Sequence, residues 1–442
     1  MLLIYTTYVS KRLQYSVDTL FKQISGLPFE LTTDINLYQQ SDADCRINYS
    51  DAKINEAELW IQPHSLLFEN DIQPQIIECF EWNNLKAFFK TAGDIPFDIF
   101  AATFYLISRY EEYLQHTKDE YGRYSHTNSL AFKKDFLHLP LINLWQKELL
   151  KLLQQKFPQF PIPNSQFRFL PTYDIDIAYS YLHKPLLNNI GGFCKELFTG
   201  KWKQLAERVG VVTGFIKDPF VNYDLLDALH EMYNLHPVYF FLVAEKRKLY
   251  DKNISPHNKY MQRLIRWYAK KYLTGIHPSW QSGDDAAILK NEILLFERII
   301  NKKITRSRQH YIRMHLPATY RLLIECGITD EYSIGYGSIN GFRASVASPF
   351  YWYDLEKDEQ TNLIIHPFCY MEANSFFEQH YSAQQAAEEL QQYHDIVKSV
   401  NGELITIFHN HFITEQKEWI EWRNMYIDFL RKNVNVIAGK TG

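Results

Sequence analysis

The sequence lacks the features that mark secreted, membrane-spanning or nucleic-acid-binding proteins. Its 442 residues include only five cysteines, which are scattered and form no Cys-x-x-Cys pair. This argues against a cysteine zinc cluster and favours reduced thiols. No apolar run approaches the ~18 residues of a membrane span, and no signal peptide is evident. The net charge of -4 leaves no basic footprint for nucleic acid. We therefore expect a cytoplasmic protein with no membrane span and no nucleic-acid partner.

What the chain does contain is apolar and aromatic residues, enough for large cores. It is 46% hydrophobic and 16% aromatic, and its length predicts about two domains. Short strand patterns such as Leu2 to Tyr8 precede an amphipathic helix at Leu141 to Phe157, and a proline-rich linker follows at Pro158 to Pro163. We place the boundary there. Residues 1–157 are predicted to form an α+β domain of unknown role.

After the linker, apolar strands alternate with helical segments over residues 165–442. The strands expected there include Phe167 to Asp176, Pro237 to Ala244, His310 to Met314 and Leu404 to Phe408. This alternation predicts an α/β domain with a parallel sheet, and a barrel is its natural closed form. In such barrels, polar residues at the carboxyl ends of strands form the functional site.

The first of these strands ends in two carboxylates, Asp174 and Asp176. Residues two apart on a strand share a side, so both acids point the same way. Two neighbouring acids at the end of an apolar strand need a compensating cation, and a divalent metal is the usual one. On this motif alone, the alternative is equally weighted: one Asp caps the next helix and the other is solvated.

Histidines and arginines follow later strands. His277 lies in Gly275-Ile276-His277-Pro278-Ser279, and Arg308 and His310 alternate onto one side of a predicted strand. The last strand leads to His409-Asn410-His411. Acids and histidines at strand ends match a zinc hydrolase, in which three ligands hold the metal and one position stays open.

These motifs, in this order, resemble those of the polysaccharide deacetylase family (carbohydrate esterase family 4). The matching segments are Thr172 to Asp176, Gly275 to Ser279, the arginine-bearing strand and Gly402 to His409. A divergent bacterial branch, which carries an extra N-terminal domain, is most similar. The resemblance implies a distorted (β/α) barrel, preceded here by the smaller α+β domain, and a hydrolase that removes an N- or O-linked acetyl group from a saccharide.

The resemblance also implies roles. Asp174 is placed as the general base, Asp176 and His277 as metal ligands, and His409 as the general acid. The sequence departs from the family pattern in two places: Ile175 separates the acidic pair, and Gln281 stands where a second metal-binding histidine is usual. We assign His310 as the third ligand, because neutral imidazole is the commonest metal ligand. The implied cofactor is a divalent metal, and zinc is the metal that we expect.

Some assignments stay open. Arg308 and Arg343 are candidates for orienting the base or binding an anionic sugar, with an equal alternative in which they are buried and paired to an acid such as Glu292 or Asp354. His409 and His411 share a side of their strand, so either one could be the acid.

The function expected is therefore deacetylation of an acetylated saccharide, in surface polysaccharide metabolism, by a hydrolase acting on carbon–nitrogen bonds other than peptide bonds. The alternative is a catalytically inactive barrel that binds a carbohydrate or a partner. A third is another metal-dependent barrel hydrolase or isomerase. The sequence leaves the oligomeric state open.

Overall fold

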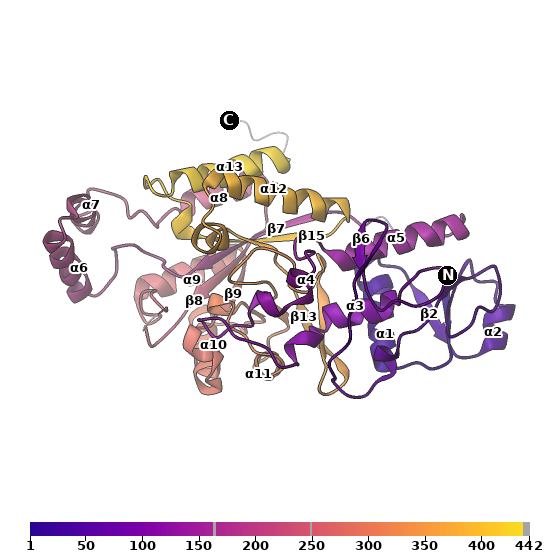
Figure 1. Ribbon diagram of the computed structural model, residues 1–442. Helices are drawn as coiled ribbons and strands as arrows, with labels where there is room; N and C mark the ends of the chain where they lie inside the picture. Colours follow the sequence, from indigo (N-terminus) through magenta and orange to yellow (C-terminus); the bar gives the residue numbers. More distant parts are fainter. Residues whose placement is uncertain (162–164, 248–249, 436–442) are drawn as a thin grey trace.

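The computed structural model describes residues 1–161, 165–247 and 250–435. It contains a four-stranded sheet near the N-terminus and a nine-stranded sheet in the rest of the described chain, with a short two-stranded ribbon between them in sequence (Figure 1). Among the described residues, no helix has both the length and the apolar character needed to cross a bilayer.

The N-terminal region is built on a parallel sheet with strand order β2-β1-β3-β4. Side chains of β1 are buried along its whole length, as expected for a central parallel strand. The elements of this region are β1 (Leu2–Thr6), α1 (Lys11–Val17), β2 (Phe29–Thr32), α2 (Ile35–Gln40), β3 (Cys45–Tyr49), β4 (Leu59–Ile61), β5 (Phe80–Trp82), β6 (Leu85–Ala87), α3 (Ile99–Ile107), α4 (Leu130–Lys133) and α5 (Leu141–Lys156).

The second sheet has strand order β12-β13-β11-β10-β9-β8-β7-β15-β14, and every pair is parallel except β12 with β13. Its strands are β7 (Arg168–Ile175), β8 (Val238–Leu242), β9 (Leu273–His277), β10 (Arg306–Ser307), β11 (Asp330–Glu331), β12 (Phe350–Asp354), β13 (Glu359–Ile365), β14 (Tyr370–Met371) and β15 (Glu403–His409). The helices of this region are α6 (Leu186–Phe198), α7 (Trp202–Val212), α8 (Tyr223–Met232), α9 (Lys259–Lys271), α10 (Ala286–Ile300), α11 (Ala318–Glu325), α12 (Ala383–Ser399) and α13 (Ile420–Asn433).

This sheet curls into the distorted (β/α) barrel that the sequence predicts. Phe240 on β8 packs against Tyr332, which follows β11, with ring centroids 5.2 Å apart. Between β11 and β14, the contact is made by the segments next to the strands: the main-chain N–H of Phe368 donates to the carbonyl of Ile334 at 3.2 Å. This hydrogen bond between loops stands in place of regular strand pairing. Helices α8, α12 and α13 cover one side, and α9, α10 and α11 lie on the other (Figure 1).

The expected strand from His310 to Met314 is wrong. The strand at this place is the two-residue β10, and His310–Ile312 forms a 3-10 turn. Tyr311 and Ile312 have left-handed φ values of 59° and 56°, which an extended strand cannot accommodate.

The two regions share an interface with buried charges. Glu112, from the turn after α3, pairs with Arg343 of the barrel at 2.6 Å and with Arg109 at 2.8 Å. Arg12 on α1 pairs with Asp358 of the barrel at 2.9 Å. Removing one partner of a buried pair such as Glu112–Arg343 destabilises a protein by several kcal/mol, so we expect the two regions to stay together.

Candidate functional site

The site residues are brought together by the register of the parallel strands. His409 at the end of β15 lies opposite Asp174 on β7, and Leu242 on β8 lies opposite His277 on β9. β10 pairs with β9 through Ser307, the residue before Arg308. The carboxyl ends of β15, β7, β9 and β10 therefore deliver acids, histidines and one arginine to one end of the barrel.

Asp176, His277 and His310 form a compact cluster. One potential ligand atom from each residue lies within 4.8 Å of those of the other two. Asp176 Oδ1 lies 3.3 Å from Nε2 of His277, and Asp176 Oδ2 lies 3.3 Å from Nε2 of His310. Both imidazoles are buried, while 18% of the Asp176 side chain is exposed, so solvent reaches the cluster.

The far nitrogen of each imidazole in the cluster is already occupied. His277 Nδ1 lies 2.5 Å from the main-chain carbonyl of Arg308, and His310 Nδ1 lies 2.8 Å from Asp251 Oδ1. Nδ1 can therefore donate in both rings, and Nε2 of each ring faces Asp176. This is the arrangement in which histidines bind metals, with a carbonyl or a carboxylate fixing the tautomer.

The charges of the cluster are strongly coupled. Burial alone would raise the pKa of Asp176, but the imidazoles of His310 and His277 outweigh it and hold the pKa well below its ordinary value. Burial alone would lower the pKa of His310, yet the carboxylates of Asp176 and Asp251 raise it to about 9. The cluster therefore favours an ionised Asp176, which is the form that binds a cation.

Asp174 has a different partner from Asp176. Its Oδ1 accepts a hydrogen bond from Arg308 Nη1 at 2.8 Å, and both side chains are buried. The guanidinium of Arg308 also lies over the ring of Phe240, 4.3 Å from its centroid. Because the arginine is fixed on two sides, it holds the Asp174 carboxylate in one orientation beside the cluster.

The two histidines after β15 have different surroundings. His409 Nδ1 lies 2.8 Å from Glu372 Oε1, and its Nε2 lies 3.4 Å from Asp176 Oδ2. Burial alone would lower the pKa of His409, but the carboxylates of Glu372 and Asp176 raise it to about 10. His411 Nδ1 is buried with no hydrogen-bond partner among the described residues, and burial lowers the pKa of His411 to about 3. Of these two histidines, only His409 is therefore suited to hold a proton at neutral pH.

Two supporting acids complete the site. Glu372 follows β14 and orients His409. Asp251 was missed, because it lies in a loop after β8 with no motif around it. Gln281 Nε2 lies 3.3 Å from Asp251 Oδ2, so this glutamine contacts the acid that orients His310.

Arg343 does not join the cluster. Its guanidinium donates to both carboxylate oxygens of Glu112, at 2.8 and 2.6 Å, and to the carbonyl of Gly335 at 3.0 Å. Neither of the acids considered as its partner from the sequence, Glu292 or Asp354, pairs with it in the described structure. We therefore assign Arg343 to the interface with the N-terminal region and not to the reaction.

The N-terminal region also reaches the site through Arg123. This buried arginine pairs with Asp119 at 2.6 Å, and its Nη1 donates to the carbonyl of Tyr311 at 3.2 Å. Tyr311 is the left-handed residue directly after His310. Arg123 thus holds the turn that aims His310 at Asp176.

Comparisons with known proteins give limited matches. Residues 2–158 match the model of a family described as one of unknown function (DUF7033), and none of the curated proteins matches the chain. A Mycobacterium smegmatis protein assigned as a polysaccharide deacetylase is 12% identical, with a TM-score of 0.38 over 61% of this chain and 86% of that one. A Puue allantoinase is 10% identical, with a TM-score of 0.37 over 60% and 85% of the two chains. A mutant of a CE4-family pseudoenzyme with restored enzymatic activity is 8% identical, with a TM-score of 0.30 over 63% and 68%.

Proposed function

We propose that this protein is a metal-dependent hydrolase that removes an acetyl group from a saccharide. The observation that carries the proposal is the convergence of Asp176, His277 and His310, whose potential ligand atoms lie within 4.8 Å of one another. Asp174 and His409 lie beside them with separate supporting partners. A barrel that only binds a ligand has no need of two oriented imidazoles that face one carboxylate.

The residues of the cluster fit a divalent cation. Asp176 Oδ1 is buried without a hydrogen-bond partner in the described structure, and such an atom calls for a cation or water. Two imidazole nitrogens and one carboxylate form a ligand set that zinc accepts in catalytic sites with an open position. When bound, zinc would act as a Lewis acid toward the substrate carbonyl and toward water.

Asp174 and His409 would handle the protons. Asp174, oriented by Arg308, would accept a proton from the water that adds to the acetyl carbonyl carbon. As the carbon–nitrogen or carbon–oxygen bond breaks, His409 would give its proton to the leaving amine or hydroxyl. Glu372 keeps the His409 ring in place and favours the protonated form, so the assigned acid carries its proton at neutral pH.

Acetate release tests this proposal. The purified chain, reconstituted with zinc, is incubated with N-acetylglucosamine oligomers and with O-acetylated xylan, and free acetate is measured. We expect turnover on at least one class and a fall of roughly 10²- to 10⁴-fold in Asp174→Asn, which keeps the hydrogen-bond acceptor for Arg308. A zinc-loaded chain that binds these saccharides but releases no acetate would instead be a binding module.

A further inference from the structure

A helical hairpin at one end of the barrel exposes many of its apolar side chains to solvent. Helices α6 and α7 form this hairpin, residues 186–216, which stands out from the barrel at the end opposite the N-terminal region (Figure 1). Large hydrophobic side chains are exposed along both helices and at both ends of the hairpin: Ile190, Phe193, Leu197, Phe198, Trp202, Val209, Val212, Phe215 and Ile216. An exposed apolar surface of this extent marks an interaction site.

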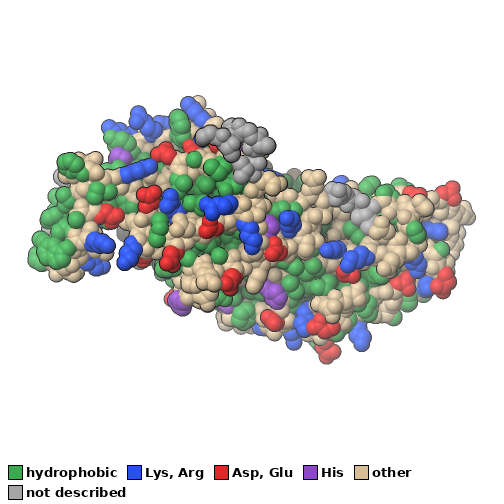
Figure 2. All heavy atoms as spheres, turned by 90° about the horizontal axis from the view of Figure 1, so that it is seen from above, with side chains coloured by type: hydrophobic (Ala, Val, Ile, Leu, Met, Phe, Trp, Pro, Cys, Tyr) green, Lys and Arg blue, Asp and Glu red, His purple; other side chains and the backbone are tan. Residues whose placement is uncertain are grey.

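The exposed apolar residues follow helical spacing. On α6 they recur at Ile190, Phe193 and Leu197, and on α7 at Trp202, Val209 and Val212. Each helix therefore presents an apolar stripe to solvent. At the ends of the hairpin, Phe198 is 86% exposed and Phe215 is 89% exposed. Figure 2 shows hydrophobic side chains gathered at this end, with Lys and Arg side chains beside them.

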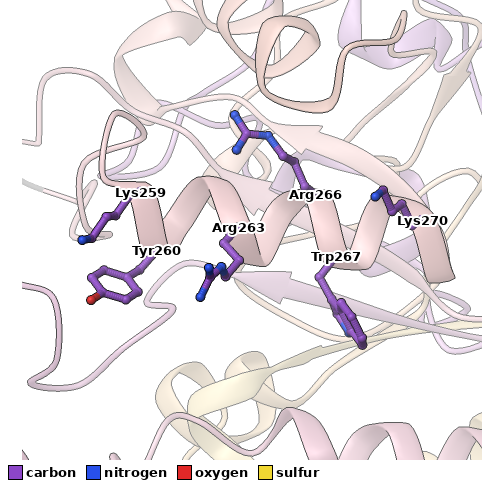
Figure 3. Close-up of a pocket in the computed structure, with 6 residues that line it drawn as sticks. All are labelled: Lys259, Tyr260, Arg263, Arg266, Trp267 and Lys270. Carbon is purple, nitrogen blue, oxygen red and sulfur yellow. The ribbon is translucent and has the colours of Figure 1, made fainter.

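A basic and aromatic helix face contacts the segment that leads into the hairpin. Asn258, the N-cap of α9, donates to the carbonyl of His183 at 2.9 Å, and the His183 ring stacks on Tyr260 with centroids 3.5 Å apart. His183 is three residues before α6. A shallow pocket of about 490 Å³ on α9 is lined by Lys259, Tyr260, Arg263, Arg266, Trp267 and Lys270, which we call the α9 face (Figure 3).

The charges of the α9 face are uncompensated. None of its four cations forms an ion pair with a carboxylate in the described part of the chain. Tyr260 and Trp267 are seven residues apart and share a side of α9, where Trp267 is 61% exposed (Figure 3). The hairpin adds more positive charge, because it holds four Lys and Arg against two acids. Glu196 pairs with Arg208, while Lys195, Lys201 and Lys203 have no ion pair in the described structure.

The sequence counts show how strongly charge is segregated. Residues 184–218 and 259–271 together hold eleven Lys and Arg but only three Asp and Glu, although the whole chain has a net charge of -4. A second copy of this chain would bring the same positive surface against itself across a two-fold axis. Like charges oppose that contact, so the surface calls for an anionic partner that also accepts apolar side chains.

We propose that the α6–α7 hairpin and the α9 face together form a surface that binds peripherally to an anionic lipid bilayer. Exposed Phe and Trp side chains would enter the boundary between headgroups and acyl chains, and Lys and Arg side chains would contact the anionic headgroups. An acidic polysaccharide would satisfy the cations but gives no role to Phe198 and Phe215. The inference does not depend on the proposed deacetylation, since it rests on residues outside the metal cluster.

Vesicle co-sedimentation tests this inference. The full chain is mixed with extruded vesicles of phosphatidylcholine alone, or of equal parts phosphatidylcholine and phosphatidylglycerol. We expect binding to the anionic vesicles only, and release at about 1 M NaCl, where the Debye length falls to ~3 Å. Phe198→Ser with Phe215→Ser should weaken binding at least about ten-fold, because it removes two inserted aromatic rings. Arg263→Gln and Lys270→Gln should each weaken it about five-fold.

Matched control variants distinguish binding through this surface from non-specific binding to vesicles. Ile76→Ser changes a side chain that is 90% exposed in the N-terminal region, and Lys302→Gln changes a lysine after α10; both should bind like the parent. All substituted side chains are exposed, so thermal unfolding should be unchanged. Three results would overturn the inference: equal binding to neutral and anionic vesicles, a dimer in sedimentation that the double Phe variant disperses, or retention on an acidic polysaccharide without vesicle binding.

Discussion

His310 Nδ1 lies 2.8 Å from Asp251 Oδ1, and this pair fixes the ring that faces Asp176. Asp251 also accepts the main-chain N–H of Trp280 at 2.9 Å, so the acid is itself held in place. The pair joins the loop after β8 to the turn after β10. Asp251 therefore orients His310, a proposed metal ligand, although Asp251 does not itself face the cluster.

Asp251→Asn should lower zinc affinity roughly 10- to 100-fold, because it weakens the hydrogen bond that fixes the tautomer and orientation of His310. Competition with a fluorescent chelator measures the change. Asp395→Asn is the matched control, since Asp395 makes the same 2.8 Å contact to His394 on α12, outside the cluster. Equal affinities in the two variants would mean that Asp251 has no part in metal binding.

Arg123→Gln should also weaken zinc binding, by about ten-fold, although Arg123 belongs to the N-terminal region. The reason is that it removes the donor to the Tyr311 carbonyl and frees the left-handed turn that presents His310. Arg321→Gln is a suitable control, because Arg321 pairs with Asp354 elsewhere in the barrel. If both variants bind zinc like the parent, the N-terminal region does not support the site.

Much of this arrangement follows from the sequence. Asp174, Asp176 and His277 end apolar strands, and strand ends in a parallel barrel meet by necessity. His310 does approach Asp176. It lies in a turn with left-handed Tyr311 and Ile312, however, and not on the strand that the sequence predicts. Local propensity cannot foresee that turn, because Arg123 holds it from a region almost 200 residues earlier.

Two other residues show what sequence patterns could not decide. Asp251 carries no motif, and only the path of its loop brings it to His310. For Arg343 the sequence left two readings equal, a role at the site or a buried pair with an acid, and the structure shows the buried pair, with Glu112 of the N-terminal region as the acid. Both depend on contacts between distant segments, which periodicity and spacing do not encode.

His409→Gln should reduce acetate release by roughly 10²- to 10⁴-fold, because glutamine cannot supply the proton to the leaving group. His411→Gln should have less than about a ten-fold effect, since the low pKa of His411 keeps that ring neutral. Steady-state kinetics of both variants provides the comparison. A larger loss in His411→Gln than in His409→Gln would reverse the assignment of the acid.

His230 should make folding stability depend on pH. Burial lowers its pKa from 6.5 to about 3, so between these values the unfolded chain binds a proton that the folded chain does not. The free energy of unfolding should therefore fall by about 1.4 kcal/mol for each pH unit of acidification from this group alone. Urea unfolding at several pH values across this range measures the free energy of unfolding. Its dependence on pH should be smaller by that amount in His230→Gln.

An exposed histidine provides the control for that slope. His257 is 60% exposed, and His257→Gln should leave the parent's pH dependence nearly unchanged. If His230→Gln also keeps the parent slope, His230 is not held neutral in the folded protein.

The proposed metal site is best tested by the metal content of the purified protein. We would measure it by elemental analysis for the parent, Asp176→Ala, His277→Ala and Asp174→Asn after reconstitution with zinc. We expect about one zinc per chain in the parent and in Asp174→Asn, and loss of the metal in the other two. A parent chain that holds no metal, or an Asp176→Ala chain that keeps it, would contradict the proposed site.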